Sequence, residues 1–149
     1  MSAAKGSAYE RELVSHFRDA GWGALRLPAS GSATKDDLPD ILASNGAETL
    51  AIEAKAGKAT TLYVDSDEVE ALERFAEPWG AQPYISGRFT TQGTPTEHYL
   101  LAPEDARQTP QGNYGIPVSD ALDRASIVVD AEGVTEVTVE YLAAQAVVA

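Results

Sequence analysis

Two acidic residues and a lysine border two short apolar segments in the first third of this chain. Asp40 precedes the apolar run 41–43, and Glu53 and Lys55 follow the run 50–52. Residues i and i+2 of a strand face the same side of a sheet. The side chains of Glu53 and Lys55 are therefore predicted to project together. If the two runs pair across the Ser-Asn-Gly-Ala turn between them, Asp40 lies close to Glu53.

Clustered carboxylate oxygens are the ligands that hard divalent cations such as Mg²⁺ prefer. A bound cation polarises a phosphate and activates water, and a nearby ammonium stabilises the charge that develops. The trio thus has the chemistry of phosphodiester hydrolysis. By itself it is a weak motif, because surface carboxylates are common and an E-x-K sequence also occurs where a strand simply leaves the core.

The composition is that of an ordinary globular protein, with 149 residues and 44% apolar side chains. This predicts one domain over residues 1–149. The absence of cysteine excludes disulfides and thiolate zinc sites, and only His16 and His98 could supply imidazole, so oxygen ligands are expected for any metal. No apolar run is long enough to cross a membrane, and no apolar signal core is present at the N-terminus, which favours the cytoplasm.

The negative charge is concentrated in the second part of the chain. The net charge is −12, of which residues 1–60 contribute −1 and residues 61–149 contribute −11. The segment with the carboxylate motif is thus nearly balanced, which weakens the argument that an acidic protein cannot bind nucleic acid. Only four of the eleven basic residues are lysine. Such acid-rich, lysine-poor surfaces resemble those of proteins adapted to molar salt; an acidic surface kept for solubility is the alternative.

A helix is predicted on the N-terminal side of the motif and a hairpin around it. Residues 7–20 have helical apolar spacing, with Ser7 as N-cap and Glu10 as its capping-box partner. A short strand at 24–27 and a polar loop at 29–38 follow. Strands at 40–44 and 49–54 then form the hairpin.

The remaining chain predicts further strands and one more long helix. Residues 56–61 read as a linker, 62–64 as a strand or turn, and 65–77 as a helix with an acidic first turn. Beyond it we expect elements in this order: strands at 82–89 and 98–102, a helical turn at 103–107, a loop at 109–115, a short helix at 119–125, and strand-like alternation from 134 that becomes ambiguous before 146. The order predicts an α/β fold with a central mixed β-sheet flanked by helices.

Four segments stand out in order along the chain: Lys5–Leu13, Arg26–Ser32, Leu38–Ile41 and Ile52–Lys55. Together they resemble the signatures of the archaeal Holliday junction resolvases, which belong to the PD-(D/E)xK nuclease superfamily. The similarity covers about residues 5–115, and residues 120–149 are not assigned by it. It implies a restriction-endonuclease-like core and a homodimer.

The resemblance also implies a metal site and a catalytic lysine. Asp40 and Glu53 resemble the metal ligands, together with the Ala54 carbonyl, and Glu10 resembles a third acidic residue of the metal shell. Lys55 resembles the lysine that orients or deprotonates the attacking water. The implied cofactor is Mg²⁺, for which Mn²⁺ can substitute. Glu10 could alternatively serve only as the capping partner of its helix.

Other residues resemble DNA contacts of the family. Ser30 resembles a serine that touches the scissile phosphate and so belongs to the catalytic set. The residues assigned to DNA binding are Arg11, Arg26, Ser32 and Lys35. The two serines could instead be ordinary loop residues, and Arg26 an ordinary surface residue of a strand.

The implied function is a structure-selective endonuclease that resolves four-way DNA junctions by paired cuts. Two symmetric cuts need two active sites, which a two-fold dimer provides. Two alternatives stay open: another PD-(D/E)xK nuclease acting in repair or restriction, and a non-catalytic acidic interaction module. The chain departs from the family in its charge, because family members usually carry a basic face.

Overall fold

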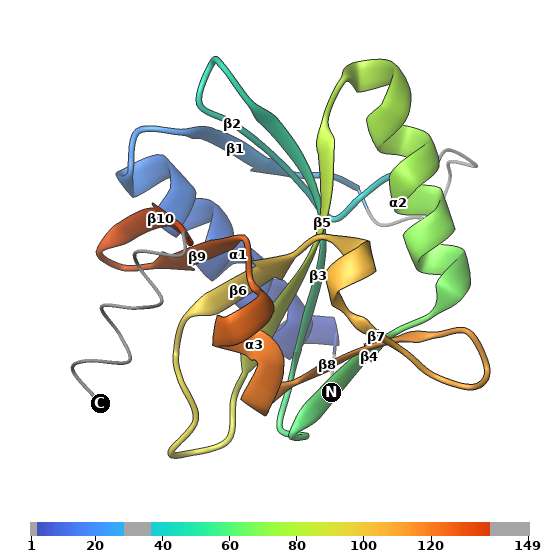
Figure 1. Cartoon of the computed structure of the whole chain (residues 1–149). Coiled ribbons are helices and arrows are strands. Elements are labelled where there is room, and N and C mark those ends of the chain that lie inside the picture. The colour runs from blue at the N-terminus through green and yellow to red at the C-terminus, as the bar shows by residue number, and fades with distance from the viewer. Residues whose placement is uncertain (1–2, 29–36, 138–149) are drawn as a thin grey trace.

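The computed structural model describes residues 3–28 and 37–137, whose strands form two sheets (Figure 1). The larger sheet has the order β1-β2-β3-β5-β6-β9-β10, and the smaller one has the order β4-β8-β7. Strands β3 and β5 are parallel, whereas the other pairs are antiparallel. The predicted α/β class with a central mixed sheet is confirmed.

The helices and strands have the following bounds: α1 Ala3–Asp19, β1 Gly23–Arg26, β2 Ile41–Ser44, β3 Thr49–Gly57, β4 Thr61–Val64, α2 Ser66–Trp79, β5 Gln82–Phe89, β6 His98–Leu101, the 3₁₀ turn η1 Pro103–Asp105, β7 Arg107–Gln108, β8 Tyr114–Pro117, α3 Val118–Arg124, β9 Ile127–Asp130 and β10 Gly133–Glu136. No helix among these is long and apolar enough to cross a membrane.

The hairpin of β2 and β3 forms in the predicted register. Ile41 pairs with Ile52, and Ser44 pairs with Thr49. The Asn45 side chain closes the turn by accepting hydrogen bonds from the backbone N–H groups of residues 47 and 48, and Gly46 supplies a φ of +92° that other residues rarely adopt. The turn therefore fixes which residues of the two strands lie opposite each other.

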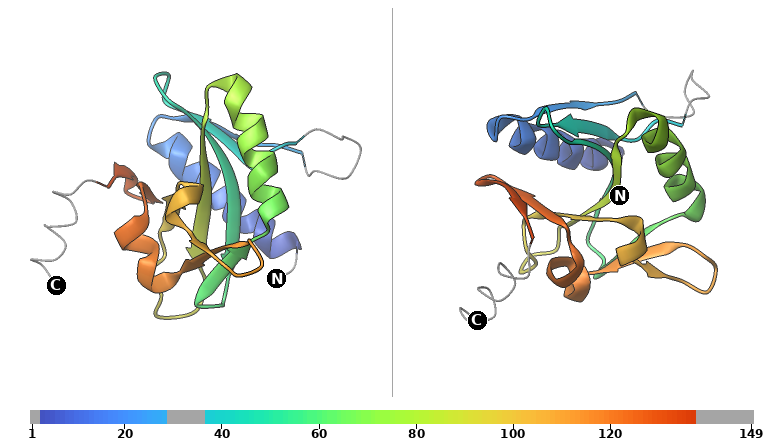
Figure 2. Two further views of the ribbon diagram at one scale, coloured as in Figure 1. Left: turned by 45° about the vertical axis from the view of Figure 1, so that its right-hand side comes forward. Right: turned by 45° about the horizontal axis from the view of Figure 1, so that its top comes forward.

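The helices α1 and α2 cover opposite faces of the sheet around β3 (Figure 2). Alternation along β3 explains this arrangement: Ile52 packs into the core under α1, whereas Ala51 packs against Leu72 of α2. Phe17 of α1 is fully buried in the first of these cores. The larger sheet also curves around α1, because its edge strands β1 and β10 both contact that helix.

Three local predictions were wrong. Helix α1 begins at Ala3, so Ser7 lies inside the helix and is not its N-cap. Strand β3 continues to Gly57, through the start of the predicted linker, because β5 pairs with it over its length. The predicted loop at 109–115 contains the start of β8, which pairs with the distant β4, and β9 was not predicted, although it pairs with the neighbouring β10 as well as with the distant β6.

Candidate active site

Strand pairing brings the carboxyl group of Asp40 to β3, next to Glu53. The backbone N–H of Asp40 donates to the carbonyl of Ile52 (3.0 Å), which extends the hairpin ladder by one residue. The Asp40 Oδ2 atom accepts a hydrogen bond from the backbone N–H of Ala54 (2.8 Å). The side chains of Asp40 and Glu53 adjoin each other. Asp40 and Glu53 therefore lie close together, as the sequence predicts.

The ammonium of Lys55 points to the first turn of α2. Its Nζ atom donates to both carboxylate oxygens of Glu68, at 3.0 and 3.2 Å. The side chain of Glu68 also lies next to that of Glu53. Lys55 and Glu53 therefore lie on the face of β3 covered by α2, as their i, i+2 spacing predicts.

Glu10 reaches the same region from α1. Arg26 of β1 holds it, with Nε donating to Glu10 Oε1 (3.2 Å), and Nη2 of the same arginine donates to the Ser7 hydroxyl (3.0 Å). The charge of Asp40 acts on Glu10. The alternative role of Glu10 as a capping partner of Ser7 is excluded by the position of Ser7 inside the helix.

The resulting carboxylate cluster consists of Glu10, Asp40, Glu53 and Glu68, and it is crowded with negative charge. Burial raises the pKa of Glu53 well above its usual range, and the neighbouring Asp40 and Glu68 raise it further. Burial also raises the pKa of Asp40, and burial together with the Asp40 charge raises that of Glu10. Burial and mutual repulsion thus shift the pKa of all three carboxyl groups upward.

The surroundings of Lys55, in contrast, favour its charged form. Burial lowers the pKa of its ammonium, but the hydrogen bond and charge of Glu68 outweigh this, so that the pKa is raised. Burial raises the pKa of Glu68, yet the hydrogen bonds from Lys55 and Glu53 leave it lowered. Lys55 and Glu68 form a charged pair beside the other three carboxyl groups.

The donor set of the carboxylate cluster fits a hard divalent cation. Oxygen ligands and a local excess of negative charge are what Mg²⁺ and similar ions require. Glu10, Asp40 and Glu53 would hold the ion, since Glu68 is occupied by Lys55. A cation there would also relieve the repulsion that raises the pKa values of these groups.

The predicted DNA contacts are only partly described by the structure. Arg11 and Arg26 line one surface pocket with Arg18, and Arg26 also contacts Glu10 of the carboxylate cluster. Ser30, Ser32 and Lys35 lie outside the described residues.

Glu68 was not predicted as a site residue. The sequence places it in the acidic first turn of α2, where it is explained by the helix dipole and by the capping box it completes with Asp65. Its contact with Lys55 spans thirteen residues and depends on how α2 packs on β3. The only signal in the sequence was that acidic first turn, which is common at helix starts.

The chain was compared with known proteins. The family description "Archaeal holliday junction resolvase (hjc)" matches residues 1–134. Among curated relatives, the crossover junction endodeoxyribonuclease Hjc of Sulfolobus acidocaldarius is 33% identical over 111 residues, which cover 74% of each protein. The protein of the same name from Archaeoglobus fulgidus is 43% identical over 82 residues, covering 55% of this chain and 60% of the relative.

The fold has a solved counterpart. The structure of Archaeoglobus fulgidus Hjc, described as a Holliday junction resolvase from an archaeal hyperthermophile, matches with a TM-score of 0.70 and 31% sequence identity. The match covers 80% of this chain and 94% of that chain.

Proposed function

The chain belongs to the archaeal Holliday junction resolvase family, and we propose that it is a crossover junction endodeoxyribonuclease that cleaves four-way DNA junctions. The observation that carries this proposal is the proximity of Asp40 and Glu53 on the β2–β3 hairpin, with Lys55 on the same face of β3 and the charge of Asp40 acting on Glu10 of α1. This arrangement supplies oxygen ligands for a cation and an ammonium beside it, as phosphodiester hydrolysis requires. Such a DNA substrate would be met in the cytoplasm.

The proposed cofactor is Mg²⁺, with Mn²⁺ as a substitute. Glu10, Asp40 and Glu53 would hold it, together with the carbonyl of Ala54. When bound, it supplies Lewis acidity toward the phosphate and toward a water molecule. The raised pKa values of the three acidic residues support this assignment, because a cation is the partner that their crowded charge lacks.

Lys55 is proposed to orient the attacking water and to stabilise negative charge on the phosphate. Its ammonium is held by Glu68, which keeps it charged and limits its rotamers. Glu68 is therefore a positioning residue. Ser30 is proposed to contact the scissile phosphate, and the DNA backbone contacts are assigned to Arg11, Arg26, Ser32 and Lys35.

A homodimer is proposed because paired cuts in opposite strands need two active sites at a fixed spacing. Helix α2 carries a candidate interface. Trp79 is 62% exposed and stacks on Phe75, with ring centroids 5.5 Å apart. These two aromatic residues line a groove together with Leu38 and Pro78, and the ion pair of Arg74 and Asp37 also borders it. Two such surfaces around a two-fold axis could cover each other.

The acidic surface is proposed to be an adaptation to high salt. At molar salt, counterion release contributes less to DNA binding and like charges are screened within a few Å. Binding would then rest on a few arginines, the metal and the shape of the junction, in place of a broad basic face.

A competition assay tests the function. Equal amounts of labelled four-way junction, nicked duplex and linear duplex are incubated with the protein and Mg²⁺ at several salt concentrations. Preferential, paired nicking of the junction is expected. Equal cleavage of linear duplex would indicate a nuclease of the same superfamily with another substrate, and no cleavage at any salt concentration would indicate a non-catalytic acidic module.

A further inference from the structure

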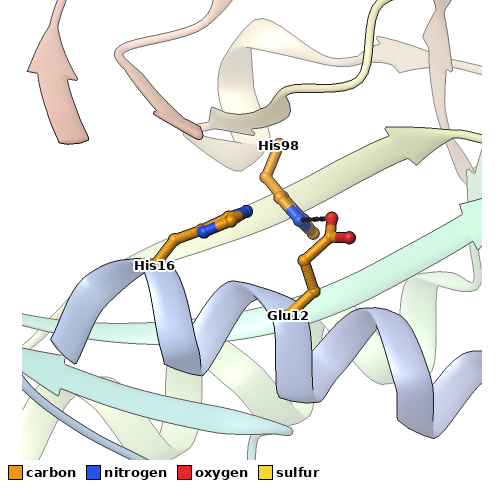
Figure 3. A group of neighbouring side chains, drawn as sticks. All are labelled: Glu12, His16 and His98. Atoms are coloured by element: carbon orange, nitrogen blue, oxygen red, sulfur yellow. Dashed lines mark hydrogen bonds and ion pairs between the residues drawn. The ribbon is translucent and has the colours of Figure 1, made fainter. Parts of the chain in front are cut away.

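A second group of possible metal ligands lies between α1 and β6, apart from the carboxylate cluster. Glu12 and His16 are one turn apart on α1, and His98 is the first residue of β6. One ligand atom from each of the three lies within 4.8 Å of the others. Figure 3 shows the two imidazole rings and the carboxylate converging on one region.

This group differs from the carboxylate cluster in position and in chemistry. Glu10 and Glu12 are two residues apart on a helix, about 200° around its axis, so their side chains leave it on nearly opposite sides. Glu10 contacts Arg26, whereas Glu12 contacts Arg88 and His98. Two imidazoles and one carboxylate suit Zn²⁺ and other divalent transition metals better than Mg²⁺.

The ligands are held in place by the fold. His98 is only 2% exposed, and its Nε2 lies 2.6 Å from Glu12 Oε1. The rings of His16 and His98 meet edge to face, with centroids 5.9 Å apart. Arg88 donates from Nε to Glu12 Oε1 (3.0 Å). Partners of this kind orient the carboxylate ligands of metal sites and leave the second oxygen available.

The geometry requires only small side-chain movements to hold a metal. In a tetrahedral site with bonds of about 2.0–2.1 Å, neighbouring ligand atoms are about 3.3 Å apart. The present separations, from 2.6 Å to at most 4.8 Å, bracket this value. Three protein ligands would leave one position open to water or another ligand.

One member of this group borders a surface pocket. His16 lines it together with Asp19, Glu132 and residues 133–134 at the start of β10. Its lining thus includes two acidic side chains, which favour a cation over an anion.

We propose that Glu12, His16 and His98 form a binding site for a divalent transition metal, represented by Zn²⁺, which links α1 to the central sheet. The metal would replace the hydrogen bond between Glu12 and His98 with bonds to all three side chains. Because the unfolded chain does not hold these residues together, binding would stabilise the folded protein.

The test uses the full chain after removal of metals by a chelator and dialysis. Zn²⁺ is titrated in a calorimeter, and thermal unfolding is followed with and without one equivalent of Zn²⁺. Co²⁺ serves as a spectroscopic probe, because imidazole ligands in a tetrahedral site give strong visible absorption. For the wild type we expect one tight site, a higher Tm with Zn²⁺ and the Co²⁺ bands.

Two variants assign the site. His16→Gln changes a half-exposed residue and is expected to bind Zn²⁺ at least tenfold more weakly, with loss of the Co²⁺ bands and of the Tm increase. Asp40→Asn, in the carboxylate cluster, is expected to keep the wild-type Zn²⁺ affinity, the Co²⁺ bands and the Tm increase. Absence of a tight site in the wild type would overturn the proposal. So would Zn²⁺ binding that survives His16→Gln but is lost in Asp40→Asn. Cleavage activity enters none of these readouts, so the outcome is independent of the proposed nuclease function.

Discussion

At the scale of single residues, the environment of Asp40 and Glu53 explains why two ordinary acids would serve as metal ligands. Each is buried enough for its pKa to be raised, and the two side chains adjoin each other. Neither side chain contacts one of the basic residues assigned to DNA among the described contacts. Their role is therefore expected to be separable from DNA binding.

Asp40→Asn and Glu53→Gln are expected to lower junction cleavage by about 10²–10³-fold, the scale of losing one charge-stabilising group in an active site. Junction affinity should change little. Cleavage of a labelled junction and a gel-shift titration measure the two properties separately. Wild-type turnover by either variant would remove that residue from the site.

Glu68→Gln is expected to lower kcat by roughly 10- to 100-fold, the usual effect of losing a partner that orients a reactive group. Glutamine still reaches the start of α2 but no longer pairs as an anion with Lys55. KM for the junction and Tm should stay near their wild-type values. Glu70→Gln, an exposed acid of the same helix, is the control and should leave kcat unchanged.

His98 is expected to make the folded state sensitive to acid. Burial lowers the pKa of its imidazole to about 4, below the usual value of 6.5. The folded state therefore disfavours the charged form, and stability falls as the pH drops from about 6.5 toward 4, by up to about 3 kcal/mol. Above pH 6.5 this contribution is constant.

Urea unfolding of the wild type and of His98→Gln, in a chelating buffer between pH 7.5 and 4, measures this effect. The wild type should lose more stability over that range than the variant, whatever their difference at pH 7.5. Parallel pH dependences would show that His98 is not the responsible group.

At the scale of elements, α1 is the part of the fold that connects both sites. Leu13 and Phe17 anchor it in the core, while Glu10 leaves it toward the carboxylate cluster and Glu12 toward His98. Helix α2 plays a similar part on the other face, since its first turn carries Glu68 and its buried side packs on β3. Each helix thus aims site residues through its own packing.

The C-terminal end of α2 depends on a glycine. Gly80 has φ +64° and ψ +23°, a left-handed conformation that closes the helix through hydrogen bonds to Ala76 and Glu77. A Cβ atom there would meet nothing within 4 Å, so only the backbone conformation resists substitution. Gly80→Ala should reduce stability by about 1 kcal/mol. Gly80→Asn should cost less, because asparagine tolerates this conformation. Urea unfolding measures both; equal stability of all three proteins would contradict the explanation.

At the scale of the whole molecule, the exposed Trp79 stacked on the half-buried Phe75 of α2 predicts the oligomeric state. Trp79→Glu should shift the protein from dimer to monomer, because it places a charge in the proposed interface. Tyr63→Glu is the control, since Tyr63 is 59% exposed on β4 and should leave the dimer intact. Light scattering after size-exclusion chromatography at molar salt measures the mass. A wild-type monomer at assay concentration would contradict the paired-cut mechanism.

Much of this protein was determined by short-range patterns in the sequence. The hairpin register follows from a turn of four residues and the two-residue period of strands, and it alone brings Asp40 to Glu53 and places Lys55 beside them. The bounds predicted for β5 agree with the structure, and those of α2 differ by at most two residues. Ser30, Ser32 and Lys35 stay predictions, because they lie outside the described residues.

The remaining features depend on contacts between distant segments. The parallel pairing of β3 with β5, the strands β8 and β9, the Lys55–Glu68 pair, and the meeting of Glu12 and His16 with His98 all require elements to pack first. Glu12 and His98 are separated by 86 residues, and no local pattern specifies such a distance. The sequence determined which residues could do chemistry near the hairpin, whereas the packing of α1 and α2 on the sheet decided which others join them. That packing is driven by burial of apolar faces. Because this driving force is non-directional, the sequence alone does not specify which faces meet, and only the folded chain shows it.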